Sequence, residues 1–228
     1  KPLGGFGEYV VVKATQAFRF PAGLSFEEAA FAEPVACCIR SLKRIGLCLA
    51  EDLLVMGAGP MGQMHVQVGL AMGARVLVSE PDPARAALAL RMGAFAAVDP
   101  AALPGLVKES TEGRGVDACV VTSPAPAALE AAVSLTRKGG RITIYTAYAD
   151  TVGIPMEANT LHRSEYLVAG TEGRTEADFY QAVRLLSFGR LDVKPLVSRT
   201  VGFGAIEAGI RAALGRETYR VLLAHEGA

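Results

Sequence analysis

The chain has 228 residues, of which 51% are hydrophobic, and this is enough for a buried core in one large domain or two unequal ones. Lys plus Arg and Asp plus Glu both number 23, so no net charge favours nucleic acid or an anionic membrane, and we expect a small-molecule ligand. No apolar run reaches membrane length and the start KPLGGFGEYV does not resemble a signal peptide, so we expect a cytoplasmic protein. The four cysteines contain no C-x-x-C pair, and we expect them to be reduced thiols.

The first expected elements are a strand, EYVVV at 8–12, and a helix in SFEEAAFAEP at 25–34. Ser25 and Glu28 have the spacing of a capping box and should start that helix. Pro34 disfavours a helical conformation for Glu33, so we expect Glu33 to be extended and the helix to bend or break there.

From residue 52 onwards, apolar strands and amphipathic helices alternate. Each strand is a Val-rich run without clean alternation, as is typical of a strand covered by helices on both faces. The pairs are DLLVMG with PMGQMHVQVGLAMG, RVLVSE with DPARAALALRMG, FAAVD with ALPGLVKES, and VDACVVTS with PAALEAAVSLTRKG, and the strands RITIYTAY and EYLVAGT follow. Asp82 before Pro83 supplies a helix cap and a first-turn proline. With right-handed crossovers, this order predicts an α/β fold with a Rossmann-type doubly wound parallel sheet.

The pattern changes after residue 170. A helix in ADFYQAVRLLSFG, preceded by a capping box of Thr175 and Asp178, leads into one strand, one helix and a final strand. We expect residues 37–170 to form a dinucleotide-binding domain. Residues 1–36 and 171–228 would then be two flanks of a second, incomplete domain.

Three glycines lie between the first strand of this alternation and its helix, in GAGPMG at 57–62. Gly57 would allow the tight turn, Gly59 would let the backbone approach a pyrophosphate, and Gly62 would let helix and strand pack closely. The helix start, with Pro60 and Met61, would offer N–H groups and a positive dipole end to phosphates.

Glu80 ends the next strand, eighteen residues after Gly62, where a carboxylate can hold both ribose hydroxyls of an adenosine. Because that carboxylate would repel a 2′-phosphate, we expect NAD rather than NADP. Arg85 could stack on the adenine or be an ordinary solvated helix residue. His65 fits a satisfied helix histidine better than a metal ligand, because no acid lies at ligand spacing.

The segments GFGEYVVV, FEEAAFAEPVACC, GAGPMG, VSEPDPARAALALRMGA, KGGRITIYTAY and DVKPLVSRTVGFG occur in an order that resembles the zinc-dependent medium-chain alcohol and polyol dehydrogenases, particularly the sorbitol and threonine dehydrogenase branch. The resemblance implies that a cofactor domain is inserted into a GroES-like catalytic domain, with remnants of the latter at both chain ends. It also implies that a secondary alcohol or polyol is oxidised by hydride transfer to NAD, with zinc polarising the alcohol.

The resemblance also assigns residues. Glu33 matches the glutamate at the zinc site, as a ligand or through metal-bound water, and Cys37 matches a position that touches the nicotinamide. Without the resemblance, Glu33 would be read as a helix-end acid and Cys37 as a small core residue. Further matches to backbone that lines the cofactor cleft are Thr122, Ser123, Tyr145, Thr146 and Ala147.

Two departures from the family pattern limit these assignments. Val121 and Pro124 replace an acid and a glycine beside the cofactor, and the cysteine and Gly-His-Glu motif of the catalytic zinc site are not in these residues. Because a catalytic zinc takes three protein ligands, we expect a fragment that binds no catalytic metal by itself, with zinc present in the full-length enzyme. The alternative is a non-catalytic NAD(H)-binding module or regulatory subunit. By resemblance we also expect a homodimer or homotetramer, paired through RITIYTAY near the sheet edge.

Overall fold

The computed structural model describes residues 6–7, 9–215 and 217–225. Its main body is a six-stranded parallel sheet with the order β3-β2-β1-β4-β5-β6. The strands are β1 (Asp52–Met56), β2 (Arg75–Ser79), β3 (Ala96–Val98), β4 (Val116–Val121), β5 (Thr136–Ile144) and β6 (Leu167–Gly170). This order is that of a doubly wound dinucleotide-binding fold, so the predicted fold class is confirmed.

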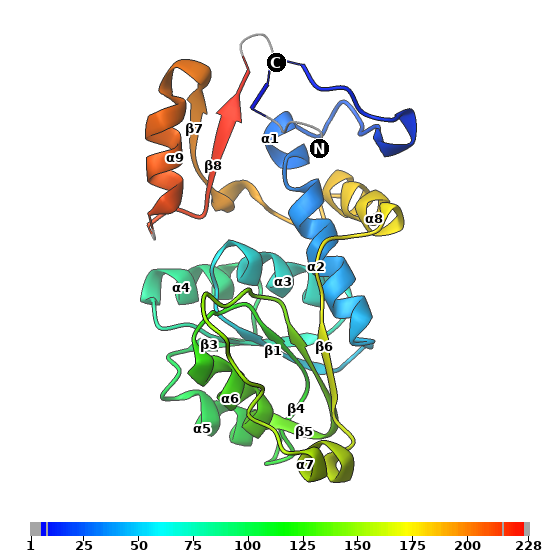
Figure 1. The fold of residues 1–228 in the computed structure, drawn as a ribbon, viewed down its shortest axis with the longest axis vertical. Helices are drawn as coiled ribbons and strands as arrows, with labels where there is room; N and C mark the ends of the chain where they lie inside the picture. The colour runs from blue at the N-terminus through cyan, green and yellow to red at the C-terminus, as the bar shows by residue number, and fades with distance from the viewer. Residues whose placement is uncertain (1–5, 8, 216, 226–228) are drawn as a thin grey trace.

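Helices cover both faces of the sheet, as Figure 1 shows. They are α2 (Ala32–Arg44), α3 (Pro60–Ala71), α4 (Pro83–Arg91), α5 (Leu103–Ser110), α6 (Pro126–Leu135) and α8 (Glu176–Ser187). Alternate residues of β1 point to opposite faces. Leu53 and Val55 join the core under α2, α3, α4 and α8, whereas Leu54 and Met56 join the core under α5 and α6. Burial on both faces explains why the strand sequences lack clean alternation.

The N-terminal part differs from the prediction in two ways. Of the strand expected at 8–12, Glu8 lies outside the described residues, and residues 9–12 form no strand because no neighbouring strand pairs with them in the described part of the chain. Ser25 caps α1 (Phe26–Ala29) through the predicted capping box, but Glu33 is helical rather than extended. The helix breaks earlier, at 30–31, and Pro34 lies in the first turn of α2, where its missing N–H is not needed.

The C-terminal part contains the predicted strand, helix and strand. β7 (Val197–Gly202) and β8 (Arg220–Ala224) form a parallel two-stranded sheet that packs on α9 (Ile206–Leu214). We call β7, α9 and β8 the small lobe. Figure 1 shows it standing over α4 and α3. Three short 3₁₀ helices, η1 (Ala14–Gln16), η2 (Lys194–Leu196) and η3 (Phe203–Ala205), and α7 (Ala158–Ser164) complete the described elements.

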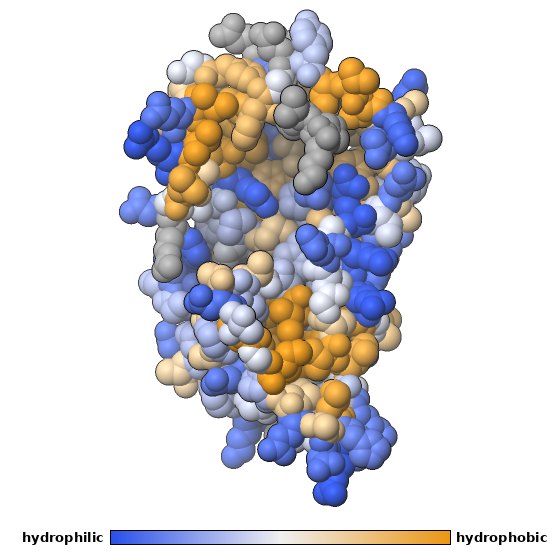
Figure 2. Space-filling view, in the orientation of Figure 1, coloured by the Kyte–Doolittle hydropathy of each residue, from blue (hydrophilic) through white to orange (hydrophobic). Residues whose placement is uncertain are grey.

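The boundary between the main body and its N-terminal flank is a continuous helix. α2 runs through the expected division at 36/37, and its buried face includes both Ala36 and Cys37. The space-filling view in Figure 2 shows apolar surface in separate patches on the upper and lower parts of the molecule. The exposed apolar side chains include Tyr9 and Val11, which are 92% and 94% exposed.

RITIYTAY lies near the edge of the sheet, as expected, but it is not the edge itself. β5, which contains the first half of RITIYTAY, pairs with β4 on one side and β6 on the other, so both of its sides are already occupied within the chain. β6 is the edge strand, because the later residues return to α8 instead of adding a further strand. Across the described ranges, no helix has the length and hydropathy needed to cross a bilayer.

Candidate functional site

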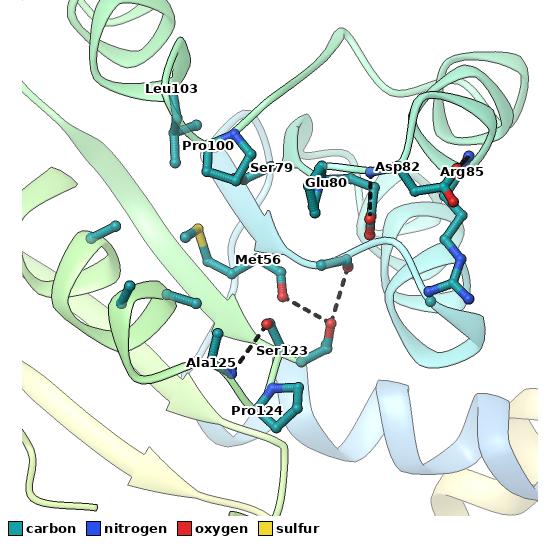
Figure 3. A pocket seen from close by; sticks show the side chains of 17 residues that line it. Met56, Ser79, Glu80, Asp82, Arg85, Pro100, Leu103, Ser123, Pro124 and Ala125 are labelled. Carbon is teal, nitrogen blue, oxygen red and sulfur yellow. Dashed lines mark hydrogen bonds between the residues drawn. The ribbon is translucent and has the colours of Figure 1, made fainter. Parts of the chain in front are cut away.

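A cavity of about 730 Å³ opens at the carboxyl ends of β1, β2 and β4. This is the point where the strand order reverses and where doubly wound sheets bind ligands. Figure 3 shows Glu80 and Asp82 on one wall and Ser123 and Ala125 on another, with Met56 between them. The complete lining is Met56, Gly57, Gly59, Ser79, Glu80, Pro81, Asp82, Arg85, Pro100, Leu103, Thr122, Ser123, Pro124, Ala125, Ala127, Ala128 and Ala131.

The three glycines of the turn have distinct roles. Gly57 has φ of +99°, a conformation that L side chains rarely adopt. A Cβ on Gly62 would collide with the carbonyl oxygen of Gly57, so helix and turn can pack this closely only with glycine there. A Cβ on Gly59 would have only Arg85 Nη1 nearby, at 3.9 Å, and would project towards the cavity. The turn therefore leaves bare backbone on its cavity side.

The start of α3 adds a positive end to this wall. Gly59 is the N-cap residue and Pro60 the first helical residue, and no side chain caps the helix. The N–H groups of the first turn, which includes Met61 and Gly62, and the positive end of the helix dipole lie beside the turn. This arrangement suits an anionic group in the cavity.

Glu80 is a buried carboxylate at the cavity wall, with only 6% of its surface exposed. Its Oε2 accepts a hydrogen bond from the Ala58 N–H at 2.6 Å, and its Oε1 accepts one from the Asp82 N–H at 3.0 Å. Glu80 thus ties the glycine turn to the start of α4. Since a carboxylate has about four acceptor positions, each oxygen can accept a further hydroxyl from a ligand.

The loop after β4 closes the opposite side. The Thr122 hydroxyl lies 2.9 Å from the Met56 carbonyl oxygen and 3.0 Å from that of Gly57, and it donates to this pair. The backbone N–H of Ser123 also donates to Met56, at 3.0 Å. The predicted departure at Pro124 therefore leaves a loop that is held firmly against the turn. Its residues line the cavity (Figure 3).

A second cluster of predicted residues lies outside this cavity, where α2 meets the end of β5. Cys37 Sγ donates to Glu33 Oε1 at 3.3 Å, and Arg174 Nε lies 3.8 Å from the same oxygen. Burial, followed by the charge of Glu33, raises the pKa of Cys37 to about 11. Burial also raises the pKa of Tyr145 well above its ordinary value. Near neutral pH this cluster holds a protonated thiol and a protonated phenol.

His65 lies behind this cluster and is completely buried. Its Nδ1 is 2.9 Å from the Met61 carbonyl oxygen and 3.4 Å from Cys38 Sγ, and its ring packs edge-on against Tyr145 with 4.6 Å between centroids. Burial lowers the pKa of His65 to about 4, so the imidazole is neutral. The position of His65 agrees with a satisfied core histidine at Nδ1, although Nε2 has no partner among the described residues.

Two residues of the small lobe reach the site and were not predicted. The ring of Tyr219 lies 5.8 Å from the Arg85 guanidinium carbon, and Arg220 Nη2 donates to Met61 Sδ at 3.2 Å. Arg220 Nε is buried without a partner in the described structure. Because 159 residues separate Arg220 from Met61, no local pattern in the sequence could reveal this contact.

The predicted residues thus fall into two groups, with one pair that belongs to neither. Gly57, Gly59, Glu80, Arg85, Thr122 and Ser123 line the cavity, and Pro60, Met61 and Gly62 form the adjoining first turn of α3. Glu33, Cys37 and Tyr145 form the second cluster. Thr146 and Ala147 follow Tyr145 in a loop and do not line the cavity; the Thr146 hydroxyl donates to the Ala147 carbonyl.

Metal ligands are sparse in the part of the chain that the structure describes. These residues contain no group of three or more His, Cys, Asp or Glu side chains that could hold a metal ion. Glu33 and Cys37 are neighbouring donors on one helix, and a zinc site needs at least one more protein ligand. The described residues alone therefore do not fit a catalytic zinc ion.

Comparison with known proteins places this site in context. The zinc-binding dehydrogenase family model matches residues 60–187, more than half of the chain. The chain is 30% identical over 228 residues to L-threonine 3-dehydrogenase of Pectobacterium atrosepticum, covering 96% of this chain and 61% of that protein. It is 31% identical over 204 residues to sorbitol dehydrogenase of Bacillus subtilis, covering 86% and 56%.

A solved structure from Sinorhizobium meliloti 1021, described as a zinc-binding dehydrogenase and bound to NADP, superposes with a TM-score of 0.87 at 26% identity, covering 96% of this chain and 66% of that one. The chain spans less than two thirds of the length of these two curated relatives. The matched residues include the glycine turn from Pro60, Glu80, Arg85 and the loop after β4. The chain therefore belongs to the zinc-binding dehydrogenase family.

Proposed function

We propose that this chain is the cofactor-binding part of an NAD-dependent dehydrogenase that oxidises a secondary alcohol or polyol. The observation that carries the proposal is the cavity at the point where the strand order reverses, bounded by bare glycine backbone on one side and by the buried Glu80 carboxylate on another. The three features together suit a dinucleotide, which has a diphosphate to approach the backbone and a ribose to bind an acid.

The diphosphate would lie against Gly59 and the start of α3. The open space beside Gly59 admits phosphate oxygens close to the backbone, and the uncapped helix start supplies positive potential. Arg220 adds a guanidinium from the small lobe. Its Nε is buried without a partner and its Nη2 donates only to a thioether sulfur, so a phosphate would give it a stronger acceptor.

The adenosine ribose would bind at Glu80. Each carboxylate oxygen already accepts one backbone N–H and has room for one ribose hydroxyl. A 2′-phosphate would bring negative charge against a buried carboxylate, so the proposal names NAD rather than NADP. The NADP bound in the Sinorhizobium meliloti structure makes this preference worth measuring directly.

The nicotinamide would extend towards the cluster of Glu33, Cys37 and Tyr145. When bound, NAD supplies the ring that accepts hydride from the alcohol. A protonated, buried Cys37 thiol offers a small apolar contact for that ring and does not compete as a nucleophile. Because the described residues do not fit a zinc ion, the proposal assigns metal binding in the full-length enzyme to Glu33 together with residues outside this chain.

The test is calorimetric titration of the chain with NADH and NADPH. Glu80→Ala should weaken NADH binding by about 1.5 to 3 kcal/mol, the typical loss for charge-assisted hydrogen bonds. Glu80→Gln retains one oxygen acceptor but carries no negative charge, so it distinguishes an effect of the lost charge from an effect of a collapsed glycine turn. Glu109→Ala, which removes an exposed acid of α5, is the matched control. Unchanged NADH affinity in Glu80→Ala would refute the assignment of the ribose site.

The same titration on the protein expressed from its complete reading frame separates the activities. NADH binding with stoichiometric zinc and turnover of a polyol supports the dehydrogenase, whereas binding without metal or turnover identifies a non-catalytic NAD(H)-binding module. Glu33→Ala should then lower the turnover rate more than it weakens cofactor binding. A cytoplasmic location and assembly as a homodimer or homotetramer remain predictions.

A further inference from the structure

A short stretch of the small lobe, at the start of β8, reaches across to the glycine turn. Tyr219 and Arg220 are consecutive, and they contact two different elements of the main body: Tyr219 contacts Arg85 at the start of α4, and Arg220 contacts Met61 at the start of α3. The positive charge of Arg220 suits the diphosphate, as proposed above. The contact between the Tyr219 ring and Arg85 needs a separate explanation.

Arg85 is fixed at its backbone, and it is one of the residues that line the cavity. Its N–H donates to the Asp82 cap at 3.0 Å, and its carbonyl oxygen accepts a hydrogen bond from Gln63 Nε2 at 2.8 Å. The guanidinium reaches back over the turn, because its Nη1 would be 3.9 Å from a Cβ on Gly59. A cation thus lies beside the bare backbone at which the diphosphate and ribose would pass.

Tyr219 lies against this guanidinium and is itself anchored. The distance of 5.8 Å between the Arg85 guanidinium carbon and the ring centroid is within the range of a cation–π contact. The Tyr219 N–H donates to Ser198 Oγ at 2.8 Å, which fixes the residue to β7. Burial raises the pKa of the Tyr219 phenol, so the ring stays neutral under the conditions of any binding assay near neutral pH.

Resting on the proposed function, we propose that Tyr219 is a positioning residue for the cofactor: its ring holds the Arg85 guanidinium over the Gly59 end of the turn, so that the small lobe helps to determine affinity for the adenosine half of NAD. A long arginine side chain loses rotamer freedom when it is held in one place. By holding Arg85 in place before the ligand arrives, Tyr219 reduces the ordering required on binding.

A merely structural role for Tyr219 predicts a different result. If the ring only packed the small lobe against α4, its removal would lower thermal stability and leave the affinity of the folded protein for NADH unchanged. A positioning role requires instead that the effect of Tyr219 on NADH affinity depends on the presence of Arg85. A double-mutant cycle measures this dependence.

The experiment measures NADH dissociation constants by calorimetry for the unaltered chain, for Arg85→Ala, for Tyr219→Leu and for the double variant. Tyr219→Leu keeps a partly buried apolar side chain without an aromatic face, and far-UV circular dichroism confirms that each variant is folded. We expect Tyr219→Leu to weaken NADH binding about 3- to 10-fold and the double variant to bind no more weakly than Arg85→Ala. Tyr219→Phe, which keeps the ring, should stay within about 2-fold of the wild type.

The matched control is Tyr180→Leu. Tyr180 is a tyrosine of α8 that contacts a different arginine, Arg184, at 5.7 Å, and neither residue lines the cavity. It should bind NADH with wild-type affinity. Losses from Arg85→Ala and Tyr219→Leu that simply add would overturn the inference and leave the proposed function intact. A wild-type chain that binds no NADH would overturn both.

Discussion

His65 should make the stability of this protein sensitive to mild acid. Burial lowers the pKa of the imidazole from 6.5 to about 4. Between these values the folded state binds fewer protons than the unfolded state, so the free energy of unfolding is highest above pH 6.5 and decreases as the pH falls towards 4. The difference between the two pKa values corresponds to about 3 kcal/mol in total, of which ~2 kcal/mol is already lost at pH 5.

The assay is urea unfolding at pH 7.5, 6 and 5 for the wild type and for His65→Leu. The variant has no titrating group at this position. Between pH 7.5 and 5 its unfolding free energy should therefore decrease by ~2 kcal/mol less than that of the wild type. Loss of the contact between Nδ1 and the Met61 carbonyl lowers the stability of the variant by an amount that does not depend on pH. Parallel pH profiles for the two proteins would refute a buried neutral imidazole.

Three further outcomes are expected. Gly62→Ala should destabilise the fold and abolish NADH binding, because its methyl group collides with the turn. Gly59→Ala should instead unfold at the wild-type temperature and lose only NADH affinity; thermal melts and calorimetry measure the two effects. Asp117→Asn should lower the free energy of unfolding at pH 7 by about 2 kcal/mol in urea unfolding, because the arginine partners of Asp117 hold its pKa at about 2. The difference in unfolding free energy between wild type and variant should shrink only as the pH falls from 3.8 towards 2. In the native protein, exposed Cys48 should react first with a thiol reagent at pH 8, and mass spectrometry should find Cys37 protected by burial and by its raised pKa.

Features determined by nearby residues were predictable. Capping boxes at Ser25 and Thr175 form as their spacing indicated, because donor and acceptor are three residues apart. The roles of Gly57 and Gly62 follow from the short path between β1 and α3. The doubly wound sheet follows from repeated strand and helix periods, since each apolar strand needs helices on both faces.

Features that depend on distant neighbours were not predictable in the same way. The stretch at 8–12 has the composition of a strand, yet among the described residues it has no strand to pair with. Pro34 restricts the preceding residue in general, but in the first turn of α2 the buried helix face outweighs that preference for Glu33. The contacts of Tyr219 and Arg220 with the turn arise only when the chain returns from α8.

The side chain of Gln67 has a consequence for how the molecule can move. Its amide donates to the Asp192 carbonyl at 2.9 Å and accepts the Asp192 N–H at 2.6 Å, as another backbone would. Leu196 is likewise buried in the core of the main body. The chain is therefore anchored up to the last residue before β7, and any rocking of the small lobe would pivot just after Leu196.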